Sequence, residues 1–233
     1  MSNNQDKKEA LARITANRHR TNLFRKHEQQ LIAFLVRYVP SFITSDMLTL
    51  LGLAGSVITA GSFVLGKDFD RSWLLLGIAG LAINWVGDSL DGRLAYYRKT
   101  PRKWYGFSLD FCVDWLTNIL IGAAYIYYAP DPKEFIGFAF VCLYGWAMMM
   151  ALLRYKIAGT YTIDSGPFGP TEVRIIIMLI LIAEVIFPQS IIYSSGTVCL
   201  ALLAIDIKEF RQLLRIADKC DKAESEQSAA SDN

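Results

Sequence analysis

Four aspartates lie within or beside two long apolar runs of the chain. Asp88 and Asp91 stand three residues apart, and Asp110 and Asp114 stand four apart. Residues at these separations project from one face of a helix, so each helix would have two carboxylates on one face. An ionised carboxylate in a membrane is costly and usually marks an ion or substrate site. Carboxylates that converge make an all-oxygen cage suited to Mg²⁺ or Mn²⁺, and two ions can share a bridging carboxylate.

These aspartates also have a structural interpretation. A single aspartate near a helix end can form an ion pair with Arg93 or Arg98, and a glycine in a membrane span is often a packing contact. Four carboxylates at this spacing, with Gly92 and Gly106 beside them, favour a binding site. The cysteines are scattered without paired spacing, and no histidine stands nearby, which argues against zinc.

Small residues flank the carboxylates. Gly92 follows Asp91 directly, Ala95 comes three residues later, and Gly106 precedes Asp110 by four. Because their side chains are small or absent, a flat or bulky ligand such as a nucleotide could lie close to the backbone there.

A second group of candidate residues follows further along the chain. Arg154 and Lys156 end one apolar run, and Glu172 and Arg174 begin the next, after the Gly/Pro-rich stretch 166–170. Cationic side chains near a helix N-terminus can bind an anionic acceptor group, but they can also anchor a helix end to lipid headgroups. Glu172 could cap its helix, pair with Arg174 or orient an acceptor, and the sequence does not choose.

The chain that must position these residues is strongly apolar. Of its 233 residues, 53% are hydrophobic and 20% charged, and the mean hydropathy is +0.28, which is typical of a membrane protein. A helix needs about 20 residues to cross a bilayer. The runs that fit are 47–65, 73–92, 107–129, 135–153, 173–187 and 191–207. We expect an all-α polytopic membrane protein with six transmembrane helices, in which the short basic loop 98–103 makes the second and third spans antiparallel neighbours.

Lysine and arginine are distributed unevenly among the connecting segments. If the N-terminus is cytoplasmic, only Lys67, Arg71 and Lys133 of the 24 basic residues fall in outside loops. Basic loops stay on the cytoplasmic side. We therefore expect an inner-membrane protein with both termini and the carboxylates at the cytoplasmic face.

Three regions follow from this layout. Residues 1–46 form a cytoplasmic segment, in which 26–44 space apolar side chains as in an amphipathic helix lying in the headgroup plane. Residues 47–207 form the six-helix catalytic domain. Residues 208–233 form a cytoplasmic tail that is largely disordered, because beyond Ala217 it has too little apolar surface to fold.

The aspartate pattern resembles the signature of the CDP-alcohol phosphotransferases, D-x2-D-G-x2-A-R-x8-G-x3-D-x3-D. It is carried by Asp88-Ser-Leu-Asp91-Gly92-Arg-Leu-Ala95 and then by Gly106-Phe-Ser-Leu-Asp110-Phe-Cys-Val-Asp114. Seven of the eight fixed positions match. Tyr96 stands where the pattern has Arg, and the spacing to Gly106 is one residue longer. The six-span layout with both ends cytoplasmic also fits this family.

The resemblance implies a role for each candidate residue. Two Mg²⁺ or Mn²⁺ ions would be held by Asp88, Asp91, Asp110 and Asp114, and Asp114 would also be the general base. The nucleotide site would consist of Asp91, Gly92, Ala95 and Gly106, with Arg98 in place of the missing arginine. The acceptor would be bound by Arg154, Lys156, Glu172 and Arg174. The implied partners are a CDP-linked donor, an alcohol acceptor, membrane lipids and a second copy of the chain, with no nucleic acid.

We expect transfer of a phosphatidyl group from CDP-diacylglycerol to a small polar alcohol, such as inositol or inositol phosphate, with release of CMP. Arg154, Lys156 and Arg174 are similar to basic residues of the phosphatidylinositol-phosphate synthases, whereas Thr171-Glu172 is similar to a pair in the choline/ethanolamine branch. The alternative is therefore transfer of phosphoethanolamine or phosphocholine from a CDP-aminoalcohol to diacylglycerol. A divalent-cation transporter is a more remote alternative, since it would place its carboxylates near the bilayer midplane.

Overall fold

The computed structural model describes residues 25–158 and 169–231, and these residues form helices without any β-strand. The helices are α2 (Arg25–Leu35), α3 (Ser45–Asp68), α4 (Leu74–Tyr97), α5 (Lys103–Tyr128), α6 (Phe135–Ala158), α7 (Pro170–Ile186) and α8 (Ser190–Ser231). Two short 3-10 helices, η1 (Val36–Tyr38) and η2 (Arg71–Trp73), precede α3 and α4. The prediction of an all-α protein is confirmed for this part of the chain.

Five segments are long and apolar enough to cross a membrane: Ser45–Asp68, Arg71–Tyr97, Lys103–Tyr128, Phe135–Ile157 and Ser190–Ala223. They correspond to five of the six predicted spans and support a polytopic membrane protein. The remaining predicted span, 173–187, corresponds to α7, which has 17 residues. At 1.5 Å per residue α7 reaches only about 25 Å, less than the roughly 30 Å of a hydrocarbon core. Its crossing stays a prediction.

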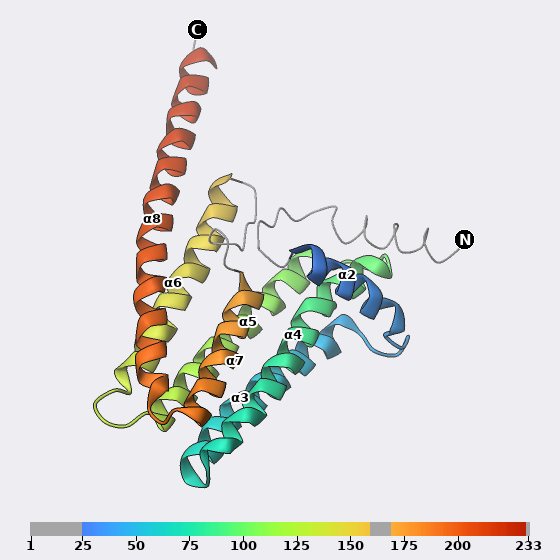
Figure 1. Cartoon of the computed structure of the whole chain (residues 1–233). Helices are drawn as coiled ribbons and strands as arrows, with labels where there is room; N and C mark the ends of the chain where they lie inside the picture. The colour runs from blue at the N-terminus through green and yellow to red at the C-terminus, as the bar shows by residue number, and fades with distance from the viewer. Residues whose placement is uncertain (1–24, 159–168, 232–233) are drawn as a thin grey trace.

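The helices run side by side with their connections at two opposite ends of the bundle (Figure 1). The helix α2, the turn between α4 and α5 and the C-terminal part of α8 lie at one end. The segment η2 and the turns that follow α5 and α7 lie at the other. The helix α2 and the C-terminal part of α8 therefore lie at the same end of the bundle, while the location of both termini at the cytoplasmic face stays a prediction.

Glycines bring α3 and α4 into backbone contact. A Cβ atom on Gly55 would lie 2.5 Å from the carbonyl oxygen of Gly80, and one on Gly87 would lie 2.5 Å from the carbonyl oxygen of Leu48. No side chain fits at these distances, so only glycine allows the two helices to approach so closely. The position of α4, which carries Asp88 and Asp91, is thus fixed by its contact with α3.

The segment before the first span also packs on α4. Its described helices are α2 and η1, which end at Tyr38, before the predicted end of the amphipathic segment at residue 44. The buried cluster between them and the bundle consists of Ile32, Ala33, Val36, Leu48, Leu90 and Leu94. Other large apolar side chains of this segment, Leu31 and Phe34, are exposed. Its predicted location in the headgroup plane stays a prediction.

The C-terminal tail differs from the prediction of disorder, because α8 continues as one helix to Ser231. This part extends beyond the other helices (Figure 1). Its residues are mainly Ala, Glu, Lys and Gln, which favour a helix, and Asp218 forms an ion pair of 2.8 Å with Lys222 one turn later. A polar segment that follows an existing helix needs only to extend it, and extension avoids the cost of starting a new helix.

Candidate functional site

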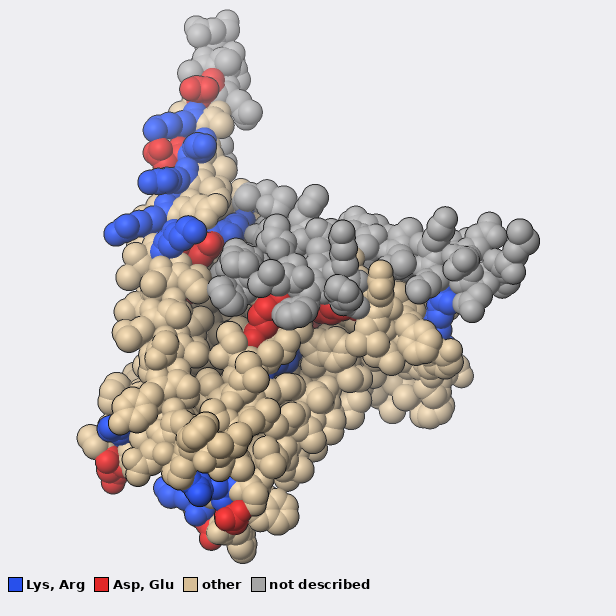
Figure 2. Space-filling view, in the orientation of Figure 1, with Lys and Arg blue, Asp and Glu red and all other residues tan. Residues whose placement is uncertain are grey.

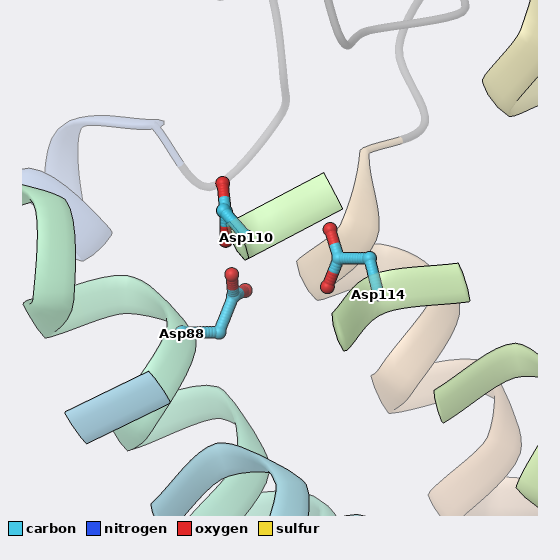
Figure 3. Close-up of side chains that lie close together, drawn as sticks. All are labelled: Asp88, Asp110 and Asp114. Carbon is cyan, nitrogen blue, oxygen red and sulfur yellow. The ribbon is translucent and has the colours of Figure 1, made fainter. Parts of the chain in front are cut away.

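Three aspartates from two helices meet at one place. Asp88 of α4 and Asp110 and Asp114 of α5 each offer a carboxylate oxygen, and these oxygens lie within 4.8 Å of one another. Figure 3 shows the three side chains turned toward a common point. All three are half-buried. The predicted convergence of the two carboxylate-bearing helices is therefore present for these three residues.

The helices α4 and α5 are not directly packed on each other, in contrast to the expected neighbouring pair. Each packs extensively on α3, which lies between them. Hydrogen bonds join all three helices, since Asn84 Nδ2 donates to the Ser56 hydroxyl at 2.9 Å and that hydroxyl lies 2.9 Å from Thr117 Oγ1. The five-residue connection 98–102 closes one end of this arrangement. The carboxylates thus come from two helices that are both held by their packing on α3.

Arg174 of α7 supplies a positive charge to this group. Its Nη2 donates to Asp88 Oδ2 at 2.7 Å, and its Nε donates to Asn84 Oδ1 at 2.6 Å. The three carboxylates bring like charges close together, and such charges repel strongly away from bulk water. A cluster of carboxylate oxygens fits a divalent hard cation such as Mg²⁺ or Mn²⁺.

Asp91 takes a different partner from the three converging aspartates. Its Oδ2 accepts a hydrogen bond of 2.8 Å from the hydroxyl of Thr49 on α3, and its Oδ1 accepts one from the Gly92 backbone. Asp91 is buried, whereas Asp88 one turn earlier is half-buried. The metal-ligand role predicted for Asp91 stays a prediction.

The residues predicted to form the nucleotide site lie along both helices. Gly92 and Ala95 are half-buried on α4. Gly106 on α5 is exposed, and a Cβ atom added to it would meet nothing within 4 Å. Gly106 is thus exposed among the described residues, and its predicted place in the nucleotide site stays a prediction.

Arg98 binds backbone carbonyls of the linker that precedes α3. Its Nη2 donates to Pro40 at 2.8 Å and to Val39 at 3.3 Å, and its Nη1 donates to Ile43. Arg102 nearby donates to Asp46, and this hydrogen bond raises the pKa of Arg102. In the structure Arg98 thus joins the α4–α5 turn to the start of α3, and its predicted contact with the nucleotide stays a prediction.

The four residues predicted to bind the acceptor do not form one cluster. Arg154 on α6 pairs with Glu209 of α8, while Arg174 reaches α4. Lys156 is exposed. Glu172 is buried, and its Oε2 accepts a hydrogen bond of 3.0 Å from the Gly169 backbone, which caps α7. Of the three roles left open for Glu172, the structure shows the cap. The stretch 159–168, which includes part of the Gly/Pro-rich segment, lies outside the described residues.

A small cavity lies directly beside the carboxylates. Its volume is about 40 Å³, and it is enclosed by α4, α5, α6 and α7. Both Asp114 and Arg174 line it. Its other polar lining residues are Asn84, Thr117, Asn118 and Tyr144, and its apolar ones are Leu81, Ile121, Phe140, Pro170, Val173 and Ile177.

Sequence reasoning missed two of the residues around the site. Thr49 is a single threonine in an apolar run, and Tyr144 is one aromatic residue among many in α6. Neither belongs to a spaced motif, so no local signal could have identified them. Their proximity to the aspartates follows from how α3 and α6 pack against the other helices.

Comparison with known proteins finds a likeness among solved structures. No family model and no curated protein matches the chain. Among solved structures, it is similar to the phosphatidylinositol phosphate synthase of Mycobacterium tuberculosis, determined with CDP-DAG bound, with a TM-score of 0.57 and 16% sequence identity. The match covers 81% of this chain and 94% of the synthase chain.

The chain has the fold of this synthase. The aspartate motif, read from the sequence, and the fold, seen in the arrangement of helices, are separate observations.

Proposed function

We propose that the protein is a CDP-alcohol phosphotransferase of phospholipid biosynthesis. It transfers the phosphatidyl group of CDP-diacylglycerol to a hydroxyl of a small polar alcohol, such as inositol or inositol phosphate, and releases CMP. The observation that carries the proposal is the convergence of Asp88, Asp110 and Asp114, at the motif's spacing, in a fold shared with a synthase that binds CDP-DAG.

The carboxylates would hold two Mg²⁺ or Mn²⁺ ions. Asp88, Asp110 and Asp114 fit this role because their oxygens lie within 4.8 Å of one another, and Asp91 would join them by exchanging its bond to Thr49. When bound, such ions supply positive charge that stabilises the donor pyrophosphate and the departing phosphate. Gly92, Ala95 and Gly106 leave room for the cytidine and pyrophosphate beside the backbone, and Arg98 lies at the same end of α4.

The transfer requires a base at the acceptor hydroxyl, and Asp114, which lines the cavity, would be that base. The Asp114 carboxylate accepts the hydroxyl proton as the hydroxyl oxygen forms a bond to the phosphorus that carries diacylglycerol. The bond between that phosphorus and the oxygen bridging to CMP breaks, and CMP leaves with the electron pair. Arg174 holds Asp88 in place through its two hydrogen bonds to α4.

The protein would act at the cytoplasmic face of the inner membrane, with α7 as the sixth span and α2 in the headgroup plane. The distribution of Lys and Arg supports this orientation. Arg154 and Lys156 would contribute to the acceptor region from α6, and two chains would form a homodimer.

The reverse arrangement, in which a CDP-aminoalcohol donates to diacylglycerol, would use the same aspartates. The pair Thr171-Glu172 suggested it, but the cap that Glu172 forms at Gly169 gives that residue a structural role. The phosphatidyl transfer is therefore preferred.

The proposal is tested by CMP release from purified protein in mixed micelles containing Mg²⁺ or Mn²⁺. One arm supplies CDP-diacylglycerol with inositol, inositol phosphate or glycerol 3-phosphate, and the other supplies CDP-ethanolamine or CDP-choline with diacylglycerol. We expect acceptor-dependent CMP in the first arm. Activity confined to the second arm would reverse the donor assignment. If neither arm released CMP while the protein still bound the metal, the result would favour a cation transporter.

A further inference from the structure

One buried polar atom of a residue that lines the cavity has no partner among the described residues. Asn118 follows Asp114 by one helical turn, is 3% exposed and lines the cavity. Its Nδ2 donates to the Val141 carbonyl of α6 at 3.1 Å. A carbonyl only accepts, so this bond fixes which end of the amide is the nitrogen. The other end, Oδ1, is buried and accepts no hydrogen bond.

A buried acceptor without a donor costs about 1–3 kcal/mol, so Asn118 Oδ1 calls for a donor inside the cavity. The amide cannot simply rotate to find one, because rotation would break the bond to Val141. Neighbouring cavity residues are engaged elsewhere, since Thr117 Oγ1 lies 2.9 Å from the Ser56 hydroxyl and the Asn84 amide binds Arg174 and Ser56. A molecule that enters the cavity could supply the missing donor.

The position of Asn118 relative to Asp114 limits what that molecule can be. Four residues of helix separate them by about 6 Å along the axis, and a hydrogen bond at each end spans about 2.8 Å. Two hydroxyls on adjacent carbons could therefore reach both side chains at once. The space of about 40 Å³ is enough for a few water-sized groups, which is the size of the hydroxylated edge of an acceptor.

We propose that this cavity receives the reacting edge of a polyol, with one hydroxyl at Asp114 and its neighbour donating to Asn118 Oδ1. This inference rests on the proposed function and specifies its acceptor. Diacylglycerol carries a single free hydroxyl and leaves Oδ1 without a donor, whereas a 1,2-diol satisfies it. Asn118 is thus a specificity-determining residue that favours polyols as acceptors.

The test compares acceptors that differ only in the second hydroxyl, using the full chain and CMP release. The pairs are glycerol 3-phosphate with 3-hydroxypropyl phosphate, and inositol with its monodeoxy analogues. We expect the wild type to use the diol about tenfold better in kcat/KM, the effect of one hydrogen bond of about 1.4 kcal/mol. In Asn118→Leu the two members of a pair should become equal within about twofold, through a higher KM for the diol with the KM for CDP-diacylglycerol unchanged.

A matched control separates recognition from packing. Thr59→Val removes a buried hydroxyl that bonds the Gly55 and Gly77 carbonyls away from the cavity, and it should keep the tenfold preference. If Asn118→Leu does not fold, Asn118→Ala serves the same comparison. A preference that survives loss of the amide would overturn the inference and leave the proposed function standing. A wild type that releases no CMP with any acceptor would overturn the proposed function itself, and the inference with it.

Discussion

At the residue scale, Arg174 contacts both the aspartate cluster and the cavity beside it. Its guanidinium binds Asp88 and Asn84 with different nitrogens, and its side chain is only 11% exposed. It also lines the cavity beside Asp114. An arginine in this position reduces the repulsion among the three carboxylates while leaving oxygen atoms that a divalent cation can bind.

Arg174→Leu should therefore make the protein more dependent on metal for its stability. Removing one member of a buried ion pair costs about 3 kcal/mol, so the melting temperature in EDTA should fall below that of the wild type. Added Mg²⁺ or Mn²⁺ should raise it more in the variant, because the cation replaces the lost charge. The measurement is thermal unfolding in detergent with and without metal, and an equal metal effect in both proteins would contradict it.

The aspartates differ in how far sequence alone could place them. Asp110 and Asp114 project together because the helical period fixes residues four apart on one face, and the convergence with Asp88 was predicted from the short connection. The hydrogen bond between Thr49 and Asp91 was not predicted, because it depends on how closely α3 approaches α4. Arg174 was assigned to the acceptor, and its contact with Asp88 joins residues 86 positions apart in the chain.

At the element scale, the glycines of α3 and α4 determine where the carboxylates lie. Gly87 directly precedes Asp88, and a Cβ atom there would lie 2.5 Å from the Leu48 carbonyl oxygen. Any side chain at this position must push α4 away from α3. The membrane pattern in the sequence predicted that both helices exist, but it did not predict that they touch through their backbones.

Gly87→Ala should lower stability by about 1–3 kcal/mol, the usual cost of overpacking, and should also reduce turnover by displacing Asp88. Gly61→Ala is the matched control, because a Cβ atom added at Gly61 of the same pair of helices meets nothing within 4 Å. That control should retain wild-type activity and unfold at the same temperature or slightly higher. Thermal unfolding and CMP release of the two variants check this, and wild-type behaviour of Gly87→Ala would show that α3 and α4 are not so close.

The last helix shows where composition misleads. The segment after Ala217 is polar enough to suggest disorder, yet it continues α8 to Ser231. Composition reports how much apolar surface a segment can bury, whereas this helix needs no core of its own because it extends a helix packed on α6.

At the scale of the whole molecule, the surface divides into an apolar body and charged ends. Figure 2 shows a largely uncharged middle of the bundle, with basic side chains along the part of α8 that projects beyond it. These basic residues are Lys208, Arg211, Arg215, Lys219 and Lys222. Such a distribution suits a bundle set in a bilayer with the α8 projection at the cytoplasmic face.

Single-cysteine labelling of a variant without native cysteines tests this orientation and the crossing of α7. Lys133→Cys, in the turn before α6, and Gln189→Cys, in the turn after α7, should both react with an impermeant maleimide from outside the cell. Lys222→Cys should react only after the membrane is opened. Labelling of Gln189→Cys from the opposite side to Lys133→Cys would show that α7 does not cross.

The most direct test of the central claim measures metal binding and CMP release together in the wild type, Asp110→Asn and Asp114→Asn. Asp218→Asn, on the projecting part of α8, is the control. We predict that both site variants bind Mn²⁺ more weakly and release CMP at least about a hundredfold more slowly, as expected for loss of a metal ligand or general base, while unfolding near the wild-type temperature. Wild-type rates of CMP release in Asp110→Asn and Asp114→Asn would contradict a metal-dependent transferase centred on these aspartates.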